Sequence, residues 1–227
     1  LEGSTFYDPH GLPNPGRENV MTARDLAVVG NELMRFPLMR EYAATAHMPF
    51  ENNTFTAGMT NPNFILQQYD GAYGIKTGYT ASAGFSVTAA ARRGDMDLIA
   101  VVTGAKASRG AQSSFSLAGR LMDVAFVTWS TIVPVREGSV VGEVPVRRGR
   151  VPAVQAVAAQ DVKTLVERGQ EATVQWTFEP WELEAPVARG DTVGTIVVVQ
   201  GAAEVARVPA LASEIVERRP WWQFWGG

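Results

Sequence analysis

The sequence contains no cysteine and only two histidines, His10 and His47, in 227 residues. Without cysteine there is no disulfide and no cysteine-based zinc site, and two histidines argue against a histidine-rich metal centre. We therefore expect neither a metal nor a cofactor. The absence of cysteine assigns no compartment, because it is compatible with an oxidising envelope and with a reducing cytosol.

An excess of charge of one sign and long apolar runs are also absent. The net charge of -3 offers no basic surplus that would attract nucleic acid, so we predict no nucleic-acid partner. The sequence has no signal peptide and no apolar run near the 18 residues that suggest a membrane span. It begins with Leu1, and we expect this start to lie inside a longer protein.

The first 130 residues combine helical and strand patterns. Residues 1–20 are rich in turn formers. Thr22 and Asp25 have the spacing of a helix cap, and Pro37 is expected to end or interrupt the helix that follows. A second short helix is predicted over residues 38–44, and residues 49–63 return to turn-forming chemistry. The apolar positions predicted to share one face of the first helix are Leu26, Val29, Leu33 and Met34.

Strand patterns begin near residue 74. Residues 85–89 alternate apolar and polar, which predicts a half-exposed strand, whereas the continuous apolar run 98–102 predicts a central strand buried on both faces. Residues 93–95 suit the hairpin turn between them. A helix is expected over residues 113–127. Its predicted buried side consists of Leu117, Leu121, Val124 and Phe126.

After about residue 130 the sequence pattern is typical of an all-β domain. Short valine-rich segments at 140–146, 151–157, 172–178 and 192–199 are separated by Gly or Pro turns. We predict a small β-sandwich or barrel-like domain over residues 131–212. The last residues, 213–227, form an aromatic tail. The expected fold class is therefore an α+β domain over residues 1–130 followed by an all-β domain.

Lys76, Thr77 and Gly78 carry the clearest chemical signal. A Lys-Thr-Gly that opens a strand is one third of a serine acyl-transferase site, whose other elements are Ser-x-x-Lys and Ser-x-Asn. Neither spacing occurs in this sequence. In such a hydrolase the ammonium and hydroxyl hold a substrate carboxylate, the glycine keeps the strand edge bare, and the amide of Tyr79 can face an oxyanion. The alternative is a surface turn with this tripeptide by chance.

Further motifs resemble the penicillin-binding D-alanyl-D-alanine carboxypeptidases of low molecular mass. They are Pro9-His10-Gly11-Leu12, Thr22-Ala23-Arg24-Asp25-Leu26-Ala27, Gly74-Ile75-Lys76-Thr77-Gly78-Tyr79-Thr80, Ala83-Gly84-Phe85 and Leu98-Ile99-Ala100-Val101-Val102. The resemblance implies part of a serine β-lactamase/transpeptidase-like domain before the all-β domain. It also implies that Lys76 and Thr77 bind the terminal carboxylate of a D-Ala-D-Ala stem peptide. By the same resemblance, the Tyr79 amide completes an oxyanion hole and Arg109 assists carboxylate binding; a solvated arginine is the alternative for Arg109.

The function implied by the resemblance is trimming of peptidoglycan stem peptides outside the cytoplasm, with β-lactams as inhibitors. This sequence alone is predicted inactive, because the nucleophile would lie upstream of Leu1. A D,D-endopeptidase or a β-lactamase would keep the same Lys-Thr-Gly, and a non-catalytic cell-wall binding or scaffold protein is the alternative. The tail after Arg218 and Arg219 suits a membrane surface or a domain-packing cluster. His10 has no carboxylate at a meaningful spacing, so a structural hydrogen bond is predicted for it.

Overall fold

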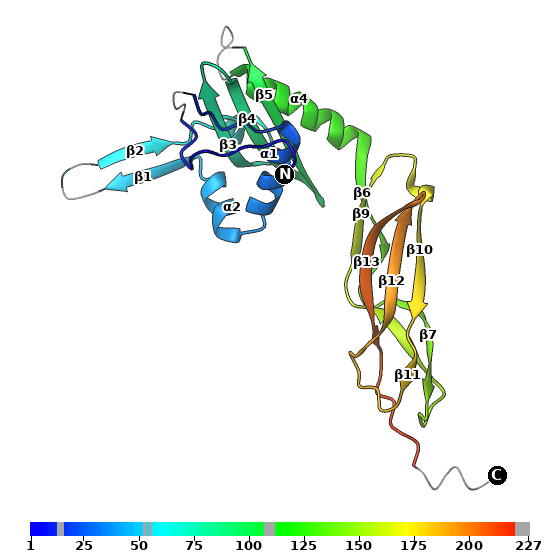
Figure 1. The fold of residues 1–227 in the computed structure, drawn as a ribbon. Helices are drawn as coiled ribbons and strands as arrows, with labels where there is room; N and C mark the ends of the chain where they lie inside the picture. The colour runs from blue at the N-terminus through cyan, green and yellow to red at the C-terminus, as the bar shows by residue number, and fades with distance from the viewer. Residues whose placement is uncertain (13–15, 52–53, 55, 107–111, 221–227) are drawn as a thin grey trace. The chain divides into compact units, whose positions relative to one another are not determined.

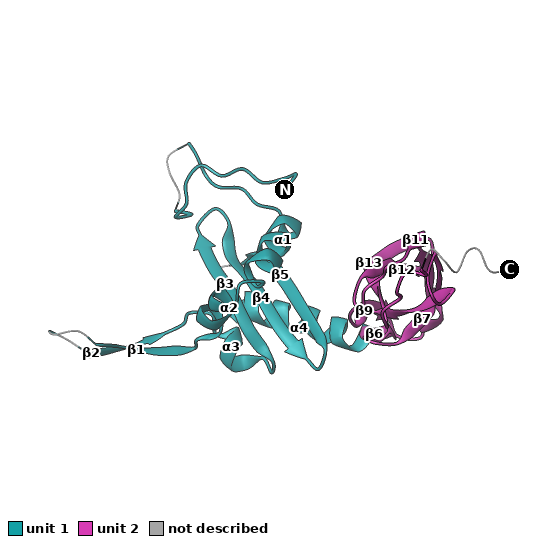
Figure 2. Cartoon of the chain, turned by 90° about the horizontal axis from the view of Figure 1, so that it is seen from below, with its two compact units in different colours: residues 1–128 teal, residues 129–227 magenta. Residues whose placement is uncertain are grey.

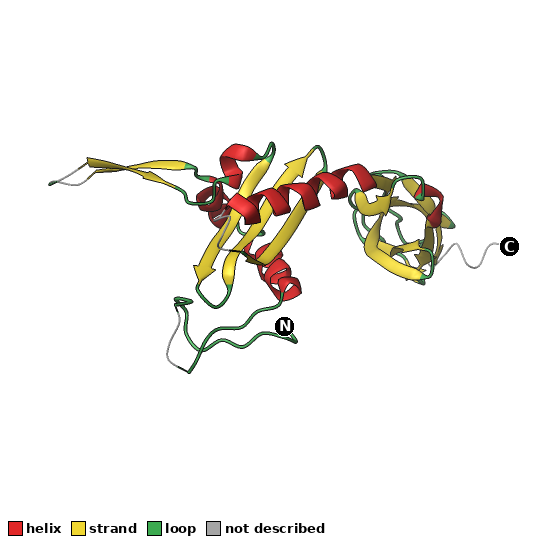
Figure 3. Cartoon of the chain, turned by 90° about the horizontal axis from the view of Figure 1, so that it is seen from above, coloured by secondary structure: helices red, strands yellow, loops and turns green. Residues whose placement is uncertain are grey.

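The computed structural model describes residues 1–12, 16–51, 54, 56–106 and 112–220. The chain divides into two compact units, Leu1–Thr128 and Trp129–Gly227 (Figure 2). The first unit mixes helices with an antiparallel sheet, and the second is built from strands (Figure 3). The predicted fold class, an α+β domain followed by an all-β domain, is confirmed.

The sheet of unit 1 has three antiparallel strands in the order β3-β4-β5, with bounds Ala72–Thr80, Gly84–Arg93 and Met96–Ala105. The predicted hairpin turn is present, and Gly94 takes the positive φ of 58° that such a tight turn favours. The prediction of which strand is central was wrong. The alternating segment lies in central β4, where residues 87–91 are all buried, whereas the apolar run lies in β5 and is partly exposed. Because the alanines of β4 are small, helices can pack close to this strand on both faces. The apolar/polar alternation in the sequence of β4 therefore did not reveal that the strand is buried.

Helix α1 (Ala23–Leu33) covers one face of this sheet, and α4 (Gln112–Thr128) covers the other (Figures 2 and 3). The predicted cap of α1 is present, because Thr22 Oγ1 accepts a hydrogen bond from the Asp25 amide at 3.0 Å. Pro37 does not interrupt α1; it occupies the first turn of the predicted second helix, α2 (Pro37–Ala44), where its missing N–H costs nothing.

The predicted buried face of α1 was partly wrong. Leu26 is half-buried and Met34 is buried, but Val29 and Leu33 are exposed. The helix meets the sheet at Gly30, where an added Cβ would lie only 3.0 Å from Ile75 Cδ1. Because the glycine lets the helix approach the sheet closely, the residues of α1 that face the sheet are 26, 30 and 34, which are spaced by four residues.

The predicted helix near residues 113–127 is confirmed as α4, but its buried side differs from the prediction. Phe126 is buried as expected, whereas Leu117, Leu121 and Val124 are 43%, 54% and 66% exposed. The helix carries a second apolar stripe, and a helical period alone does not say which stripe faces the sheet. The buried apolar side chains of α4 are Phe115, Ala118, Met122 and Phe126.

Residues 49–63, expected to be turns only, contain a hairpin of β1 (His47–Glu51) and β2 (Thr56–Thr60), followed by the short helix α3 (Ile65–Gln68). That expectation was wrong because almost every residue of the two strands is exposed, which leaves no alternation in the sequence to detect. Figure 1 shows the hairpin extending from unit 1, with α3 between it and β3 in sequence.

Unit 2 contains a six-stranded sheet in the order β10-β12-β13-β8-β7-β11 and a two-stranded sheet of β6 and β9. The four predicted valine-rich segments correspond to β7, β8, β10 and β12. The strand bounds are β6 Trp129–Val135, β7 Val140–Arg147, β8 Ala153–Ala158, β9 Val162–Glu167, β10 Val174–Pro180, β11 Leu183–Glu184, β12 Thr192–Gln200 and β13 Ala203–Ala212. A single core of small and branched side chains, including Val144, Ile196 and Val198, joins the two sheets.

Candidate active site

The Lys-Thr-Gly segment lies on β3, at the edge of the described sheet. Its inner side pairs with β4, in the register Lys76 to Thr88, Thr77 to Val87 and Gly78 to Ser86. An edge strand offers unpaired backbone N–H and C=O groups that an extended peptide can join. The prediction that this motif lies at a strand edge therefore agrees with the topology.

The side chains along this edge are accessible. Lys76 is exposed, and its Nζ donates a hydrogen bond to the Thr77 carbonyl at 2.5 Å. A Cβ built on Gly78 meets no atom within 4 Å, so the glycine is not required by packing within the described residues. Tyr79 is 55% exposed, and its ring lies 4.4 Å from the Phe85 ring at a tilt of 32°. The edge is thus open at Gly78 and bordered by an aromatic pair.

Two cavities share the segment from Lys76 to Tyr79. One, of about 380 Å³, is also lined by Phe6, Leu12, Glu18, Asn19, Met21, Leu26, Thr80, Ser86 and Thr88, among others. The other, of about 600 Å³, adds His10, Pro62, Phe64, Phe85, Ser114 and Phe115. The backbone of β3 and the ammonium group of Lys76 therefore border cavities that are large enough for a short peptide.

One wall of the smaller cavity comes from the N-terminal segment, which side chains hold in place. Asn19 Oδ1 accepts from the Tyr7 amide at 2.7 Å, and Asn19 Nδ2 donates to the Asp8 carbonyl at 2.9 Å. Asp25 Oδ2 accepts from the Ser4 hydroxyl at 2.5 Å and from the Gly3 amide at 3.2 Å. The Ser4 hydrogen bond is the main cause that lowers the pKa of Asp25. Sequence reasoning found Asp25 only as part of a helix cap and missed Asn19.

A second set of hydrogen bonds ties this wall to the β3–β4 turn. The Ser82 hydroxyl donates to Glu18 Oε2 at 2.8 Å, and Ser82 Oγ lies 3.1 Å from Thr80 Oγ1. Thr80 Oγ1 in turn accepts from the Ala83 amide at 2.9 Å. Glu18 and Ser82 are 64 positions apart, so no sequence spacing indicated that they meet at the lip of the cavity.

The remaining predicted site residues have different outcomes. Arg109 lies outside the described residues. His10 lines the larger cavity, and its Nδ1 lies 3.0 Å from the Leu12 amide. The expectation that no carboxylate accompanies His10 was wrong, because Asp8 Oδ1 lies 3.1 Å from the same nitrogen. These contacts are local turn contacts within residues 8–12, as predicted for a structural role.

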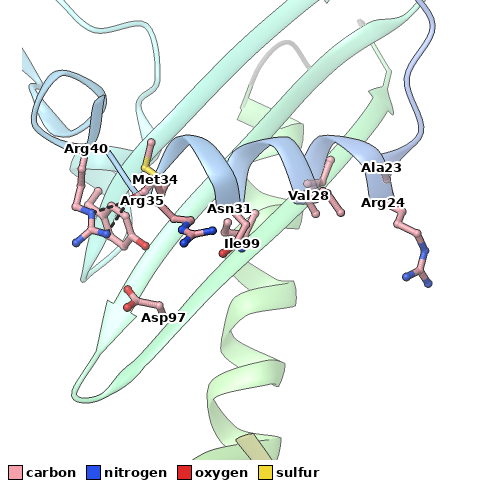
Figure 4. A pocket seen from close by; sticks show the side chains of 12 residues that line it. Ala23, Arg24, Val28, Asn31, Met34, Arg35, Arg40, Asp97 and Ile99 are labelled. Carbon is pink, nitrogen blue, oxygen red and sulfur yellow. Dashed lines mark hydrogen bonds between the residues drawn. The ribbon is translucent and has the colours of Figure 1, made fainter. Parts of the chain in front are cut away.

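A larger groove, of about 720 Å³, lies beside α1 over β5, and Figure 4 shows Arg24, Arg35, Arg40 and Asp97 around it. Asp97 is engaged there, since Arg92 binds it through two hydrogen bonds of 2.6 and 2.8 Å. Burial raises the pKa of Asp97, but hydrogen bonds from Arg92 and Tyr73 outweigh burial and lower it overall. Across the part of the chain that the structure describes, no group of three or more His, Asp or Glu side chains could hold a metal ion.

Comparison with known proteins identifies both units. A family model for D-alanyl-D-alanine carboxypeptidase matches residues 1–107, and a model for the C-terminal domain of penicillin-binding protein 5 matches residues 129–218. Together the two matches cover most of the chain, so both of its units are similar to domains of penicillin-binding carboxypeptidases. The Lys-Thr-Gly edge and the smaller cavity lie within the first match, whereas the larger cavity also includes Ser114 and Phe115 beyond it. The valine-rich β unit makes up the second match.

Curated carboxypeptidases match this chain over almost all of its length. The D-alanyl-D-alanine carboxypeptidase DacF of Bacillus subtilis is 26% identical over 221 residues, and DacC of Escherichia coli is 31% identical over 220 residues. Each match covers 96% of this chain but only 56% and 53% of the relatives. The crystal structure of penicillin binding protein 5 from Haemophilus influenzae, at 25% identity, superposes with a TM-score of 0.67 over 95% of this chain and 61% of that one. The chain thus spans about half the length of the curated relatives it matches.

Proposed function

We propose that the protein to which this chain belongs is a serine-type D-Ala-D-Ala carboxypeptidase that trims peptidoglycan stem peptides. The observation that carries the proposal is the Lys-Thr-Gly segment on an open sheet edge beside two cavities, inside the region that matches the carboxypeptidase family. Lys76 and Thr77 bind the terminal carboxylate of the peptide. A cationic ammonium and a neighbouring hydroxyl give that carboxylate charge-assisted hydrogen bonds.

The strand then orients the peptide for acyl transfer. The peptide backbone joins the free edge of β3, and Gly78 leaves open the approach to its scissile bond. The Tyr79 amide donates to the oxygen that becomes negative when a serine hydroxyl adds to the carbonyl. The C–N bond to the last D-Ala then breaks, the amine leaves with the proton taken from the serine, and water later cleaves the serine ester.

Acylation is the test of this proposal. A protein extended upstream of Leu1 along its native reading frame, with a Ser-x-x-Lys and a Ser-x-Asn, is expected to form a covalent penicillin adduct visible by intact mass spectrometry. The present chain alone is expected to form none, because it has no such serine. Lys76→Ala should slow acylation of the extended protein by about 10²-fold or more, whereas the exposed Lys106→Ala serves as a matched control. Unchanged acylation in Lys76→Ala, or an adduct on the present chain, would refute the assignment.

The same extended protein separates the alternatives. Release of D-Ala from a stem pentapeptide indicates a carboxypeptidase, cleavage of cross-linked dimers indicates an endopeptidase, and rapid turnover of penicillin indicates a β-lactamase. The all-β unit 2, matched to the C-terminal domain of a penicillin-binding protein, favours the first two over a β-lactamase. An upstream sequence without either serine element would instead favour a non-catalytic cell-wall binding or scaffold protein.

We propose that the protein lies outside the cytoplasmic membrane and associates with its surface through the C-terminal tail. None of the described helices is long and apolar enough to span a bilayer. Arg218 and Arg219 precede a segment with three tryptophans and one phenylalanine, a composition suited to a membrane interface. Co-sedimentation with anionic vesicles should decrease when residues 218–227 are removed, and equal sedimentation of both proteins would exclude the tail as the anchor.

A further inference from the structure

Glu18 is an acidic residue in the lining of the 380 Å³ cavity that also includes Lys76. Of the described residues lining the 380 Å³ cavity, Glu18 and Lys76 are the two with ionised side chains, and they have opposite charge. Most of the remaining lining is apolar or carries a hydroxyl group, as Phe6, Met21 and Thr88 illustrate. A ligand that fills this cavity therefore meets one cation and one anion, which suits a peptide with a carboxylate and a separate ammonium group.

The position of Glu18 is fixed at one end of the strand. Its Oε2 accepts from Ser82 at 2.8 Å, and Ser82 belongs to the turn that follows β3. Among the described residues only Ser82 donates to this carboxylate, which leaves Oε1 able to accept from a further donor. Lys76 lies four residues before the end of β3 at Thr80. At about 3.3 Å per residue of strand, the two charges are separated along β3 by a distance on the order of 13 Å or more.

The separation between Lys76 and Glu18 can be compared with the length of the peptide that would bind here. This comparison rests on the proposed function. If Lys76 and Thr77 hold the terminal carboxylate and Tyr79 faces the scissile carbonyl, the peptide runs from its carboxyl end toward the β3–β4 turn. The residue before D-Ala-D-Ala then lies beside Thr80 and the turn that bonds Glu18. In peptidoglycan stems that residue is a diamino acid, whose side chain ends in an ammonium group when it is not cross-linked.

We propose that Glu18 binds the side-chain ammonium of this diamino acid and so favours stem peptides with a free amino group. Glu18 is exposed, so solvent and salt weaken the attraction. We therefore expect a preference of about two- to fivefold, the upper part of the range typical of an exposed charge pair. The preference should fall as salt rises, whereas carboxylate recognition supplies the binding that both peptides share.

The test uses the chain itself and two peptides, Nα-acetyl-L-lysyl-D-alanyl-D-alanine and its Nε-acetylated form. Dissociation constants come from NMR titrations, which measure weak binding. The unmodified chain should bind the free amine about two to five times more tightly. Glu18→Gln should reduce this ratio to about one and leave binding of the acetylated peptide unchanged, whereas Glu41→Gln, on the exposed surface of α2, should keep the full ratio.

Lys76→Ala separates this inference from the proposed function. It should weaken binding of both peptides, because both present the same carboxylate. Equal affinities in the unmodified chain, with both lowered by Lys76→Ala, would overturn the role of Glu18 and leave the carboxypeptidase proposal intact. If neither peptide binds, or if Lys76→Ala changes nothing, the carboxylate site fails and the role of Glu18 fails with it. A ratio retained in Glu18→Gln would also overturn the inference.

Discussion

The two units distribute their apolar side chains in different ways. In unit 2, Val144, Ile196 and Val198 are fully buried in one core that joins both sheets. In unit 1, Val28 on α1 and Leu121 on α4 remain 50% and 54% exposed. Burial of apolar surface is the main stabilising contribution to a fold. Unit 2 gains this stabilisation from its own strands, whereas the described part of unit 1 leaves some of its apolar side chains exposed. Unit 1 instead exposes a sheet edge and cavities suited to a ligand.

The largest effect should come from opening a cavity in unit 2. Ile196→Ala is expected to lower the free energy of unfolding by about 2–5 kcal/mol, because its side chain is fully buried. Val124→Ala on α4, 66% exposed, should change it by less than about 0.5 kcal/mol.

The aromatic residues allow the two units to be followed separately. All six tryptophans lie in unit 2 and all five tyrosines lie in unit 1. Urea unfolding followed by tryptophan fluorescence therefore reports on unit 2 and measures the effect of Ile196→Ala, whereas the tyrosine signal reports on unit 1 and measures the effect of Val124→Ala. A loss from Val124→Ala as large as that from Ile196→Ala would contradict the contrast between the units.

Two glycines provide a sharper comparison. A Cβ at Gly194 would lie 2.4 Å from the Phe178 ring and 2.7 Å from the Glu179 carbonyl, so Gly194→Ala should cost about 1–3 kcal/mol. A Cβ added at Gly78 meets no atom of the described residues within 4 Å, so Gly78→Ala should leave the urea midpoint unchanged. It should nevertheless weaken D-Ala-D-Ala peptide binding in an NMR titration, since the methyl group occupies the open edge. Normal peptide binding by Gly78→Ala would argue against the proposed approach.

A smaller, pH-dependent effect is expected in the N-terminal segment of unit 1. The pKa of Asp25 is lowered in the folded chain, so its contribution is fully present above its unfolded pKa of about 3.9 and is lost as the pH falls through the folded value. Hydrogen exchange at the Gly3 amide should therefore become less protected as Asp25 is protonated. Ser4→Ala should raise the Asp25 pKa measured by NMR, and an unchanged pKa would assign the shift to another contact.

How far the sequence predicts this molecule depends on which contacts are local. Thr22 and Asp25, three positions apart, indicated the α1 cap, and the Lys-Thr-Gly tripeptide indicated its own strand edge. The buried side of α4 was wrong because both its stripes are apolar, and only the partner sheet selects one. The pairing of Glu18 with Ser82 could not be predicted, since no local pattern links residues that the fold brings together. Local structural contacts were therefore predictable, and the composition of the cavity walls was not.

The smallest effect on stability is expected for a substitution of Leu121, on the exposed face of α4. Together with Leu117 and Val124 it forms an apolar stripe on the side of α4 opposite the buried Met122. Exposed apolar stripes favour association, so Leu121→Gln should reduce concentration-dependent self-association in analytical ultracentrifugation while changing the free energy of unfolding by less than about 0.5 kcal/mol. Val205→Gln, at a 41% exposed valine of unit 2, is the matched control and should leave association unchanged. If Val205→Gln reduces association and Leu121→Gln does not, the associating surface belongs to unit 2, and the contrast drawn between the two units is wrong.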